Sequence, residues 1–234
     1  MIIDFHSHIL PGVDHGSKDL DQTKRQLEII SKSGVDKVVA TSHFYPHVHS
    51  VNKFISDVDS ALDKIAQLKD IHRDTDVLVG AEVLVCEMID RMDGLEQLCI
   101  RGTRCILLEM PTAINWGASL MGTVENLIDN GYDVVLAHID RYINQRKKEI
   151  DSLLNLGAKA QINADSLASF FVRKKLIKYI DEGTVCAIGS DMHGANAKEY
   201  KLFSDAERYI GKDRFDKIME KSFEKLRNAK SVNG

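Results

Sequence analysis

Short apolar runs alternate with segments of helical periodicity along the whole of this 234-residue chain. Each apolar run covers three to five residues, which is a typical length for a strand buried in a parallel sheet. The segments between the runs are long enough to hold the helices that connect parallel strands. The alternation therefore predicts repeated strand–helix units around one sheet. The predicted strands are Ile2–Phe5, Lys37–Ala40, Val77–Val79, Cys105–Leu108, Asp133–Ala137, Ala160–Ile162 and Val185–Ile188.

The clearest helical segment lies between the second and third predicted strands. Apolar residues recur there at spacings of three and four from Val51 to Leu68, which predicts an amphipathic helix of about five turns. No linker or low-complexity stretch divides the chain, and barrels of roughly 200 to 250 residues form one domain. We therefore expect a single domain over residues 1–234 with an α/β fold, namely a barrel closed by about seven units. An open doubly wound sheet is the alternative.

Charge and hydropathy exclude several classes of protein. The chain carries 31 Lys and Arg against 35 Asp and Glu, a net charge of −4, and has no basic block, so we expect no nucleic-acid partner. No run approaches the ~18 consecutive apolar residues of a membrane span, and the first residues lack the pattern of a signal peptide, so we expect no membrane insertion. The four cysteines are scattered without a C-x-x-C pair, which fits a cytoplasmic protein.

Residue types that bind metal ions follow six of the seven predicted strands. A single His or Glu at a strand end is usually a hydrogen-bonded loop residue, but this recurrence argues for a shared site. In a parallel barrel the carboxyl ends of all strands face one mouth, so these side chains converge. Imidazole and carboxylate ligands without thiolate suit Zn, Mn or Fe. The residues are His6 and His8, His43, Glu82, Glu109, His138, and Asp191 with His193.

Six motifs carry a resemblance to a known superfamily over nearly the whole chain. They are DFHSHILPGVDHG (4–16), GVDKVVATSH (34–43), GAE (80–82), LLEMP (107–111), VVLAHIDRY (134–142) and IGSDMHG (188–194). The chain resembles the PHP metallohydrolases, and most closely their bacterial protein-tyrosine phosphatase branch encoded with capsule and exopolysaccharide genes. The resemblance implies a PHP-type distorted (β/α)7 TIM-like barrel. It also implies hydrolysis of phosphotyrosine on a bacterial tyrosine kinase that controls polysaccharide export.

The resemblance further implies three divalent metal ions, with Mn as the first expectation and Fe, Zn or Co as alternatives. The implied ligands are His6, His8, Glu82 and Asp191 for one ion, Glu82 with Glu109 and His138 for the second, and His15, His43 and His193 for the third. The branch usually has Asp-Asp-Gly where this chain has Asp14-His15-Gly16. We therefore expect His15 as the ligand. Asp14 is expected as its neighbour or substitute, or as a general acid.

The resemblance also implies how the phosphate is held, and an aromatic residue near a strand end is a candidate for contact with the substrate. Arg141 matches the arginine that holds the substrate phosphate, and Tyr142 beside it is an aromatic candidate for contact with the phenyl ring. A second phosphate-binding arginine of the branch is absent, and Lys198 is expected to supply a looser charge in its place. A cysteine nucleophile is not supported because no cysteine begins a C-x5-R sequence. A histidinol-phosphate phosphatase and a non-catalytic metal-bound interaction domain are the alternative functions.

Overall fold

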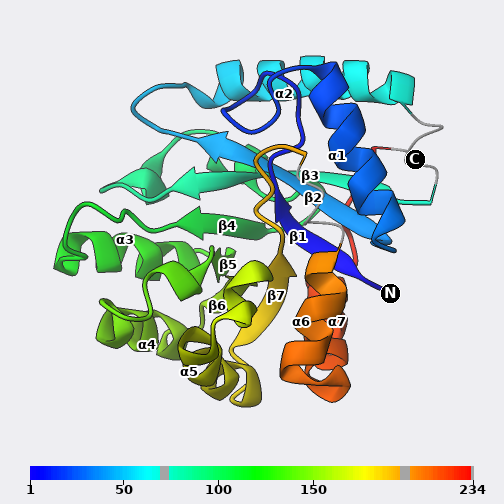
Figure 1. Cartoon of the computed structure of the whole chain (residues 1–234). Helices are drawn as coiled ribbons and strands as arrows, with labels where there is room; N and C mark the ends of the chain where they lie inside the picture. Colours follow the sequence, from blue (N-terminus) through cyan, green and yellow to red (C-terminus); the bar gives the residue numbers. More distant parts are fainter. Residues whose placement is uncertain (69–73, 196–200, 233–234) are drawn as a thin grey trace.

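Seven parallel strands form one sheet in chain order in the computed structural model, which describes residues 1–68, 74–195 and 201–232 (Figure 1). All seven predicted strands are confirmed. Several of them extend further than predicted, by up to five residues at one end. The strands are β1 Ile3–Ser7, β2 Lys37–Phe44, β3 Asp76–Leu84, β4 Cys105–Glu109, β5 Asp133–Leu136, β6 Lys159–Asn163 and β7 Val185–Gly189.

The first and last strands come together and nearly close the barrel. Ser7 forms a parallel bridge with Met192, the amide of His8 donates to the Met192 carbonyl at 3.1 Å, and the amide of Asp191 donates to the His6 carbonyl at 2.8 Å. A doubly wound sheet would place its first strand in the middle and its later strands out of sequence order. The sequential order and this closure therefore exclude the open-sheet alternative.

Some of the polar residues expected after strands instead lie within them. His6 is in β1, His43 in β2 and Glu82 in β3, and His43 is the register partner of Glu82 on the neighbouring strand. The strands continue through these residues because the backbone ladder does not depend on the polarity of the side chains. Partners in register lie side by side on one face of the sheet, so this pairing places an imidazole beside a carboxylate.

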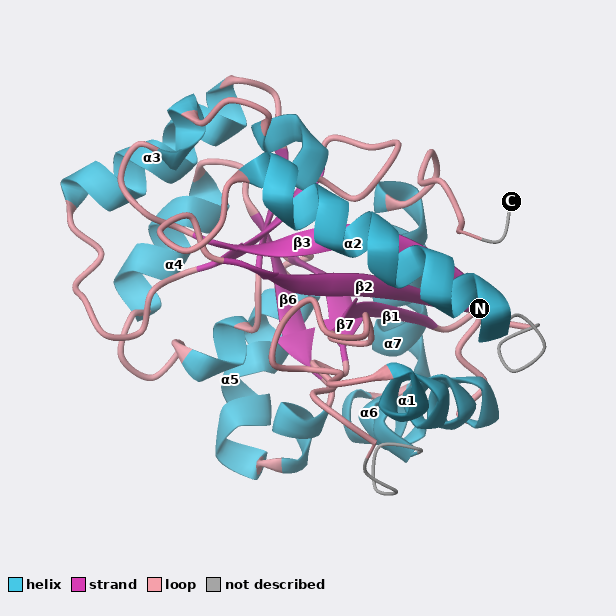
Figure 2. Cartoon of the chain, turned by 90° about the horizontal axis from the view of Figure 1, so that it is seen from above, coloured by secondary structure: helices cyan, strands magenta, loops and turns pink. Residues whose placement is uncertain are grey.

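The predicted amphipathic helix is confirmed as α2, Val51–Ile65, which continues into the 3-10 helix η1, Ala66–Leu68. The Ser50 hydroxyl accepts a hydrogen bond from the amide of Lys53 at 3.3 Å and caps its first turn. Phe54 and Val58 are buried on its inner face. Figure 2 shows this helix lying across β2 and β3, where it covers that part of the barrel.

The other helices surround the remaining strands, with one exception. The connection from β3 to β4 contains two 3-10 helices, η2 Ile89–Arg91 and η3 Leu95–Leu98, where a regular unit would have an α-helix. The remaining elements are α1 Leu20–Lys32, α3 Ala118–Asp129, η4 Ile139–Arg141, α4 Lys147–Asn155, η5 Asp165–Ala168, α5 Phe170–Asp181, α6 Leu202–Ile210 and α7 Lys212–Lys225.

The strands are buried on both faces, which explains their uninterrupted apolar sequences. Ile106, Leu107 and Leu108 of β4 are successive residues that point to opposite faces, and all three are fully buried. The barrel interior covers one face and the helices cover the other. Among the helices of the described residues, none is both long and apolar enough to cross a bilayer.

Candidate metal centre

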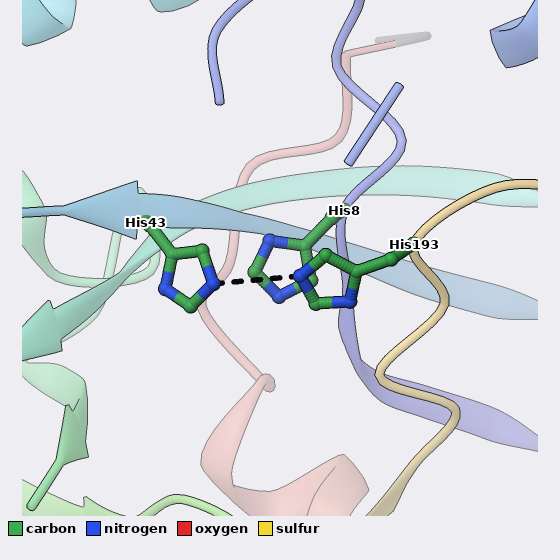
Figure 3. A group of neighbouring side chains, drawn as sticks. All are labelled: His8, His43 and His193. Atoms are coloured by element: carbon green, nitrogen blue, oxygen red, sulfur yellow. Dashed lines mark hydrogen bonds between the residues drawn. The ribbon is translucent and has the colours of Figure 1, made fainter. Parts of the chain in front are cut away.

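The metal-binding residue types converge at the carboxyl ends of the strands, as expected from the topology. Three overlapping groups have ligand atoms within 4.8 Å of one another. Figure 3 shows the first of them, in which the rings of three histidines from different segments face one another. The groups are His8, His43 and His193; His6, His8 and Glu82; and His43, Glu82 and Glu109.

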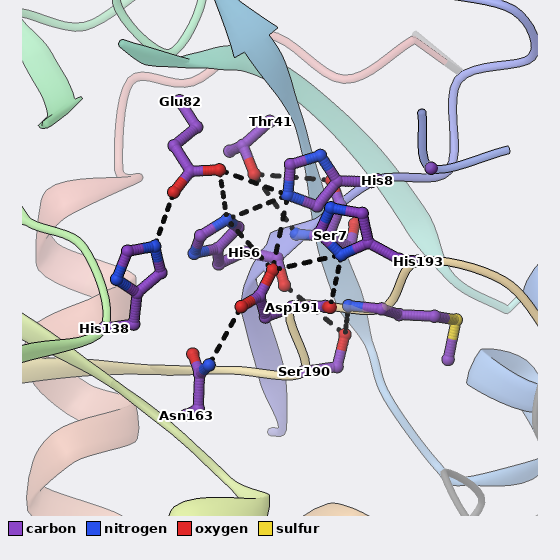
Figure 4. Close-up of polar contacts among 12 residues, drawn as sticks. His6, Ser7, His8, Thr41, Glu82, His138, Asn163, Ser190, Asp191 and His193 are labelled. Atoms are coloured by element: carbon purple, nitrogen blue, oxygen red, sulfur yellow. Dashed lines mark hydrogen bonds and ion pairs between the residues drawn. The ribbon is translucent and has the colours of Figure 1, made fainter. Parts of the chain in front are cut away.

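Glu82 belongs to two of these groups and is fully buried, and Figure 4 shows its contacts with the surrounding histidines. Its Oε1 lies 2.7 Å from Nε2 of His138, and its Oε2 lies 3.1 Å from Nε2 of His6 and 3.2 Å from Nε2 of His8. Nδ1 of His43 is 3.0 Å from the same oxygen. Burial opposes the charged form, but the surrounding imidazoles hold the pKa of this carboxyl well below its usual range. The centre therefore holds an anionic carboxylate among four imidazoles.

Asp191 reaches the same space from the end of β7. Its Oδ1 lies 3.4 Å from Nε2 of His8 and 3.7 Å from Nε2 of His6, and its Oδ2 accepts hydrogen bonds from Arg141 and from Asn163. Asp191 has a φ of 52°, in the left-handed region that non-glycine residues seldom adopt. The backbone accepts this conformation at the point where it directs the carboxylate into the cluster.

The hydrogen-bond partners of His6 and His8 indicate which nitrogen of each ring carries the proton. Nδ1 of His6 lies 3.1 Å from Oε1 of Gln161, and Nδ1 of His8 lies 2.7 Å from Oδ2 of Asp14. Both partners are acceptors, so in the neutral rings Nδ1 carries the proton and Nε2 presents a lone pair. The two Nε2 atoms are 3.1 Å apart. Two lone pairs at this distance repel each other, and either a proton between the nitrogens or a metal cation beside them removes the repulsion.

Several buried polar atoms around this space make no hydrogen bond within the described part of the chain. They include Oε2 of Glu82, Oδ1 of Asp191 and Nδ1 of His43. Buried polar atoms without a partner are costly and need an explanation. Nitrogen and oxygen donors without thiolate suit divalent cations such as Zn, Mn or Fe. The residues present therefore fit metal ions.

Glu109 lies at the more open side of the cluster. Its carboxylate is 15 % exposed, 3.7 Å from Nδ1 of His43 and 3.9 Å from Nε2 of His138. Burial and the nearby charge of Glu82 raise its pKa. The structure thus brings Glu82, Glu109 and His138 together, which is the set that the resemblance implied for one ion.

The structure places His15 differently from the other candidate ligands. Its side chain is exposed, and its ring stacks at 4.7 Å on the rings of both His43 and His193. It belongs to none of the three groups, which is also true of His138 and Asp191, and His8 completes the histidine group with His43 and His193. His15 therefore covers the outer side of this group in the present geometry.

Asp14 is held by three hydrogen bonds next to the histidine cluster. Its Oδ2 lies 2.7 Å from Nδ1 of His8 and accepts the amide of His43 at 2.8 Å, and its Oδ1 accepts the amide of Gly16 at 2.9 Å. The side chain is 3 % exposed. Burial favours the neutral form, but these hydrogen bonds lower the pKa of the carboxyl far below its usual value. Asp14 thus orients His8 as carboxylates commonly orient metal-binding histidines. Its role as a general acid stays a prediction.

Replacing Asp14 by asparagine is expected to weaken metal binding about 10- to 100-fold, because His8 loses its charged partner and the Gly16 amide loses its acceptor. Metal affinity is measured by competition with a chromogenic chelator. The pH profile of kcat at saturating metal separates the two roles of Asp14. An unchanged pH profile of kcat is expected if Asp14 only positions His8. Loss of the decrease in kcat at high pH would instead show that Asp14 acts as a general acid.

Two functional residues escaped the sequence analysis, and both lie on β6, the strand without an expected ligand. Oε1 of Gln161 accepts the amide of His138 at 2.6 Å and faces Nδ1 of His6. Its Nε2 donates to Oδ1 of Asn163 at 2.9 Å, and Asn163 donates to Asp191. This buried chain connects residues of three other segments of the mouth. A glutamine inside a short apolar strand was the available signal.

Replacing Gln161 by leucine is expected to lower the free energy of unfolding by about 1–3 kcal/mol, because the buried amide of His138 loses its acceptor. Metal affinity should fall as well, since His6 loses the group that fixes its tautomer. Denaturant unfolding and chelator competition measure the two effects. The control is Gln67→Leu on the exposed side of η1, and equal losses in both variants would contradict the assignment.

The three predicted substrate-binding residues, Arg141, Tyr142 and Lys198, differ in how the structure places them. Arg141 ends η4 at the mouth and is 44 % exposed. Tyr142 is buried, with its ring 5.6 Å from that of His138 and 5.2 Å from that of Trp116, and its hydroxyl has no hydrogen-bond partner among the described residues. Lys198 lies outside the described residues.

The amino-acid sequence of this chain is similar to those of a known protein family over nearly its whole length. The sequence model of the family Capsular polysaccharide synthesis, CpsB/CapC, matches residues 2–232. The chain belongs to this family. The tyrosine-protein phosphatase CpsB of Streptococcus agalactiae is 25 % identical over 248 aligned positions, which cover 99 % of this chain and 98 % of that protein. The tyrosine-protein phosphatase YwqE of Bacillus subtilis is 26 % identical over 213 positions, covering 85 % and 80 %.

Solved structures agree with the CpsB/CapC assignment at the level of the fold. A chain from the crystal structures of YwqE from Bacillus subtilis and CpsB from Streptococcus pneumoniae, described as metal-dependent tyrosine phosphatases, matches with a TM-score of 0.79 at 23 % identity, covering 98 % of this chain and 96 % of that one. The histidinol phosphate phosphatase of Lactococcus lactis matches with a TM-score of 0.57 at 12 % identity, covering 90 % and 94 %. These likenesses confirm the PHP-type distorted (β/α)7 TIM-like barrel.

Proposed function

We propose that this chain is a metal-dependent protein-tyrosine phosphatase, a single catalytic domain over residues 1–234. We place it in the cytoplasm, and its proposed substrate is phosphotyrosine on a bacterial tyrosine kinase that controls capsule or exopolysaccharide synthesis. Its CpsB and YwqE relatives carry the name tyrosine-protein phosphatase. The observation that carries the proposal is the position of Arg141, whose guanidinium donates to a carboxylate of the buried imidazole–carboxylate cluster. The guanidinium of Arg141, which can bind an anion through two parallel hydrogen bonds, therefore lies beside a site that fits several cations.

The proposed cofactors are three divalent ions, with manganese first and iron, zinc or cobalt as alternatives. Divalent ions at such a site lower the pKa of a water molecule and neutralise phosphate charge. Three ions would bring six positive charges to three carboxylates, so an anionic phosphate is favoured over a cationic substrate. The proposed ligands are His6, His8, His15, His43, Glu82, Glu109, His138, Asp191 and His193.

Arg141 is the proposed phosphate-binding residue. Its planar guanidinium can donate two parallel hydrogen bonds to phosphate oxygens, and its partial exposure at the mouth lets substrate reach it. These hydrogen bonds would strengthen as negative charge develops on the equatorial oxygens. The hydroxyl of Tyr142 is a buried donor without a partner among the described residues, and we propose that it donates to the bound substrate.

The leaving group favours an aryl ester over an alkyl ester. A phenolate has a pKa of about 10, several units below that of an alkoxide, so it departs without strong general-acid assistance. Both oxygens of Asp14 already accept hydrogen bonds, from His8 and from two amides, so we propose no such assistance from this residue. A site with this arrangement is suited to phosphotyrosine.

The deciding experiment compares kcat/KM for a phosphotyrosyl peptide and for histidinol phosphate at the same metal loading. We expect a clear preference for the peptide. A chelator should abolish turnover and added Mn, Co or Zn should restore it, whereas a thiol alkylator should have little effect. Cys99, Cys105 and Cys186 are buried, and burial raises the pKa of each thiol. A preference for histidinol phosphate would overturn the proposed substrate, and activity that resists chelation would overturn the proposed metal dependence.

A further inference from the structure

A groove of about 600 Å³ lies between α4 and α5, which run side by side on the outer surface of the barrel (Figure 1). Its walls include Ile143 from the segment before α4, and Phe171 and Tyr179 from α5. Phe171 is 79 % exposed, and Phe170 beside it is 62 % exposed. Single exposed apolar residues are common, but two adjacent exposed phenylalanines, one of them lining a groove, form the kind of apolar patch that often marks an interaction site.

The charge of the groove is opposite to that of the chain as a whole. Lys147, Lys174, Lys175 and Lys178 line it, and no acidic residue does, whereas the chain has a net charge of −4. Lys147 and Lys178 form ion pairs along their own helices, and the amine of Lys175 donates to the side chain of Asn144 at 2.5 Å. Lys174 and Lys175 have no carboxylate partner among the described residues. Two exposed lysines thus remain available to an anionic partner.

One end of the groove lies close in the chain to the proposed phosphate-binding residue Arg141. Ile143 is the second residue after Arg141, and two residues span at most about 7 Å. Phe171 is the second residue of α5, which follows β6 at the same mouth of the barrel. A polypeptide whose phosphotyrosine occupied the site could therefore continue directly into the groove.

We propose that the groove binds the acidic polypeptide that flanks the substrate phosphotyrosine, with its apolar residues on Phe171 and its carboxylates or further phosphates at Lys174 and Lys175. This inference rests on the proposed function and specifies its substrate class. The lysine stems cover apolar surface while their amines face outward, so one groove receives both kinds of side chain. The surface would contribute to the recognition of peptides and make no contact with a small aryl phosphate.

The test compares two substrates in the full chain: a phosphotyrosyl peptide with glutamates on both sides and p-nitrophenyl phosphate. The variant Lys174→Glu/Lys175→Glu is expected to lower kcat/KM for the peptide about tenfold, mainly through KM, because two attractions become repulsions. Turnover of p-nitrophenyl phosphate and metal content should stay within about twofold. A peptide flanked by lysines should instead improve with this variant. The Phe171→Ala variant should show the same selectivity for the peptide with a smaller loss.

The control variant Lys32→Glu/Lys64→Glu makes the same change in net charge. Both residues are exposed in the last turns of α1 and α2, at the helix ends away from the mouth. Equal losses in the two double variants, or equal losses for peptide and p-nitrophenyl phosphate, would overturn the proposal. A change of oligomeric state by Phe171→Ala with unchanged peptide kinetics would also overturn it, because the groove would then bind a second copy of the chain. Absence of p-nitrophenyl phosphate hydrolysis in the unmodified chain would instead contradict the proposed function.

Discussion

Replacing Glu82 by alanine is expected to lower kcat/KM for a phosphotyrosyl substrate by more than about a thousandfold, or about 4 kcal/mol of transition-state stabilisation. Its two oxygens lie within 3.2 Å of nitrogens from four histidines. Removing the carboxylate would leave these imidazoles around a cavity without the negative charge that offsets the bound cations. The protein should then bind fewer metal ions, which elemental analysis of the purified variant measures.

The control variants separate lost charge from lost packing. Glu82→Gln retains the volume of the side chain but removes its charge, so it should lose nearly as much activity as Glu82→Ala. Glu125→Ala, on the exposed side of α3, removes one carboxylate far from the cluster and should be neutral. Circular dichroism checks that each variant is folded. Full metal content in a folded Glu82→Ala protein would contradict the central position that we give to this residue.

Replacing Arg141 by alanine is expected to cost about 2–4 kcal/mol in kcat/KM, roughly 30- to 1,000-fold. The reason is the loss of two charge-assisted hydrogen bonds to phosphate oxygens. Because the side chain is 44 % exposed, its removal should leave the free energy of unfolding almost unchanged. Steady-state kinetics with a phosphotyrosyl peptide, together with denaturant unfolding, measure both quantities.

Arg141 also donates to Asp191, so its role has a second explanation that must be tested separately. If it acted only by holding this carboxylate, Arg141→Ala would lose metal ions and the loss of activity would disappear at high metal concentration. We expect metal content to persist and the defect to remain at saturating metal. Arg141→Lys should recover only part of the activity, because an ammonium group does not match the phosphate with a planar fork of donors.

Local patterns in the chain were sufficient to predict the seven strands, the helix α2 and the gathering of His6, Glu82 and His138 at one mouth. Buried strands impose uninterrupted apolar runs, and a parallel barrel turns the carboxyl ends of all its strands to the same side. Both rules depend only on the pattern of apolar residues along each segment and on the direction in which each strand runs. They therefore apply before any contact between distant residues is known.

The hydrogen bonds that orient the candidate ligands followed no such local rule. Asp14 engages His8 while His15 stacks outside, and Gln161 links His6 to the amide of His138 across three strands. These pairings depend on strand register, on the closure of β1 against β7 and on side-chain rotamers. His6 and Gln161, for example, are 155 positions apart in the sequence. The groove between α4 and α5 likewise exists only because two helices pack side by side. Such contacts are properties of the folded chain, since the periodicity of each segment is the same whichever neighbour it meets.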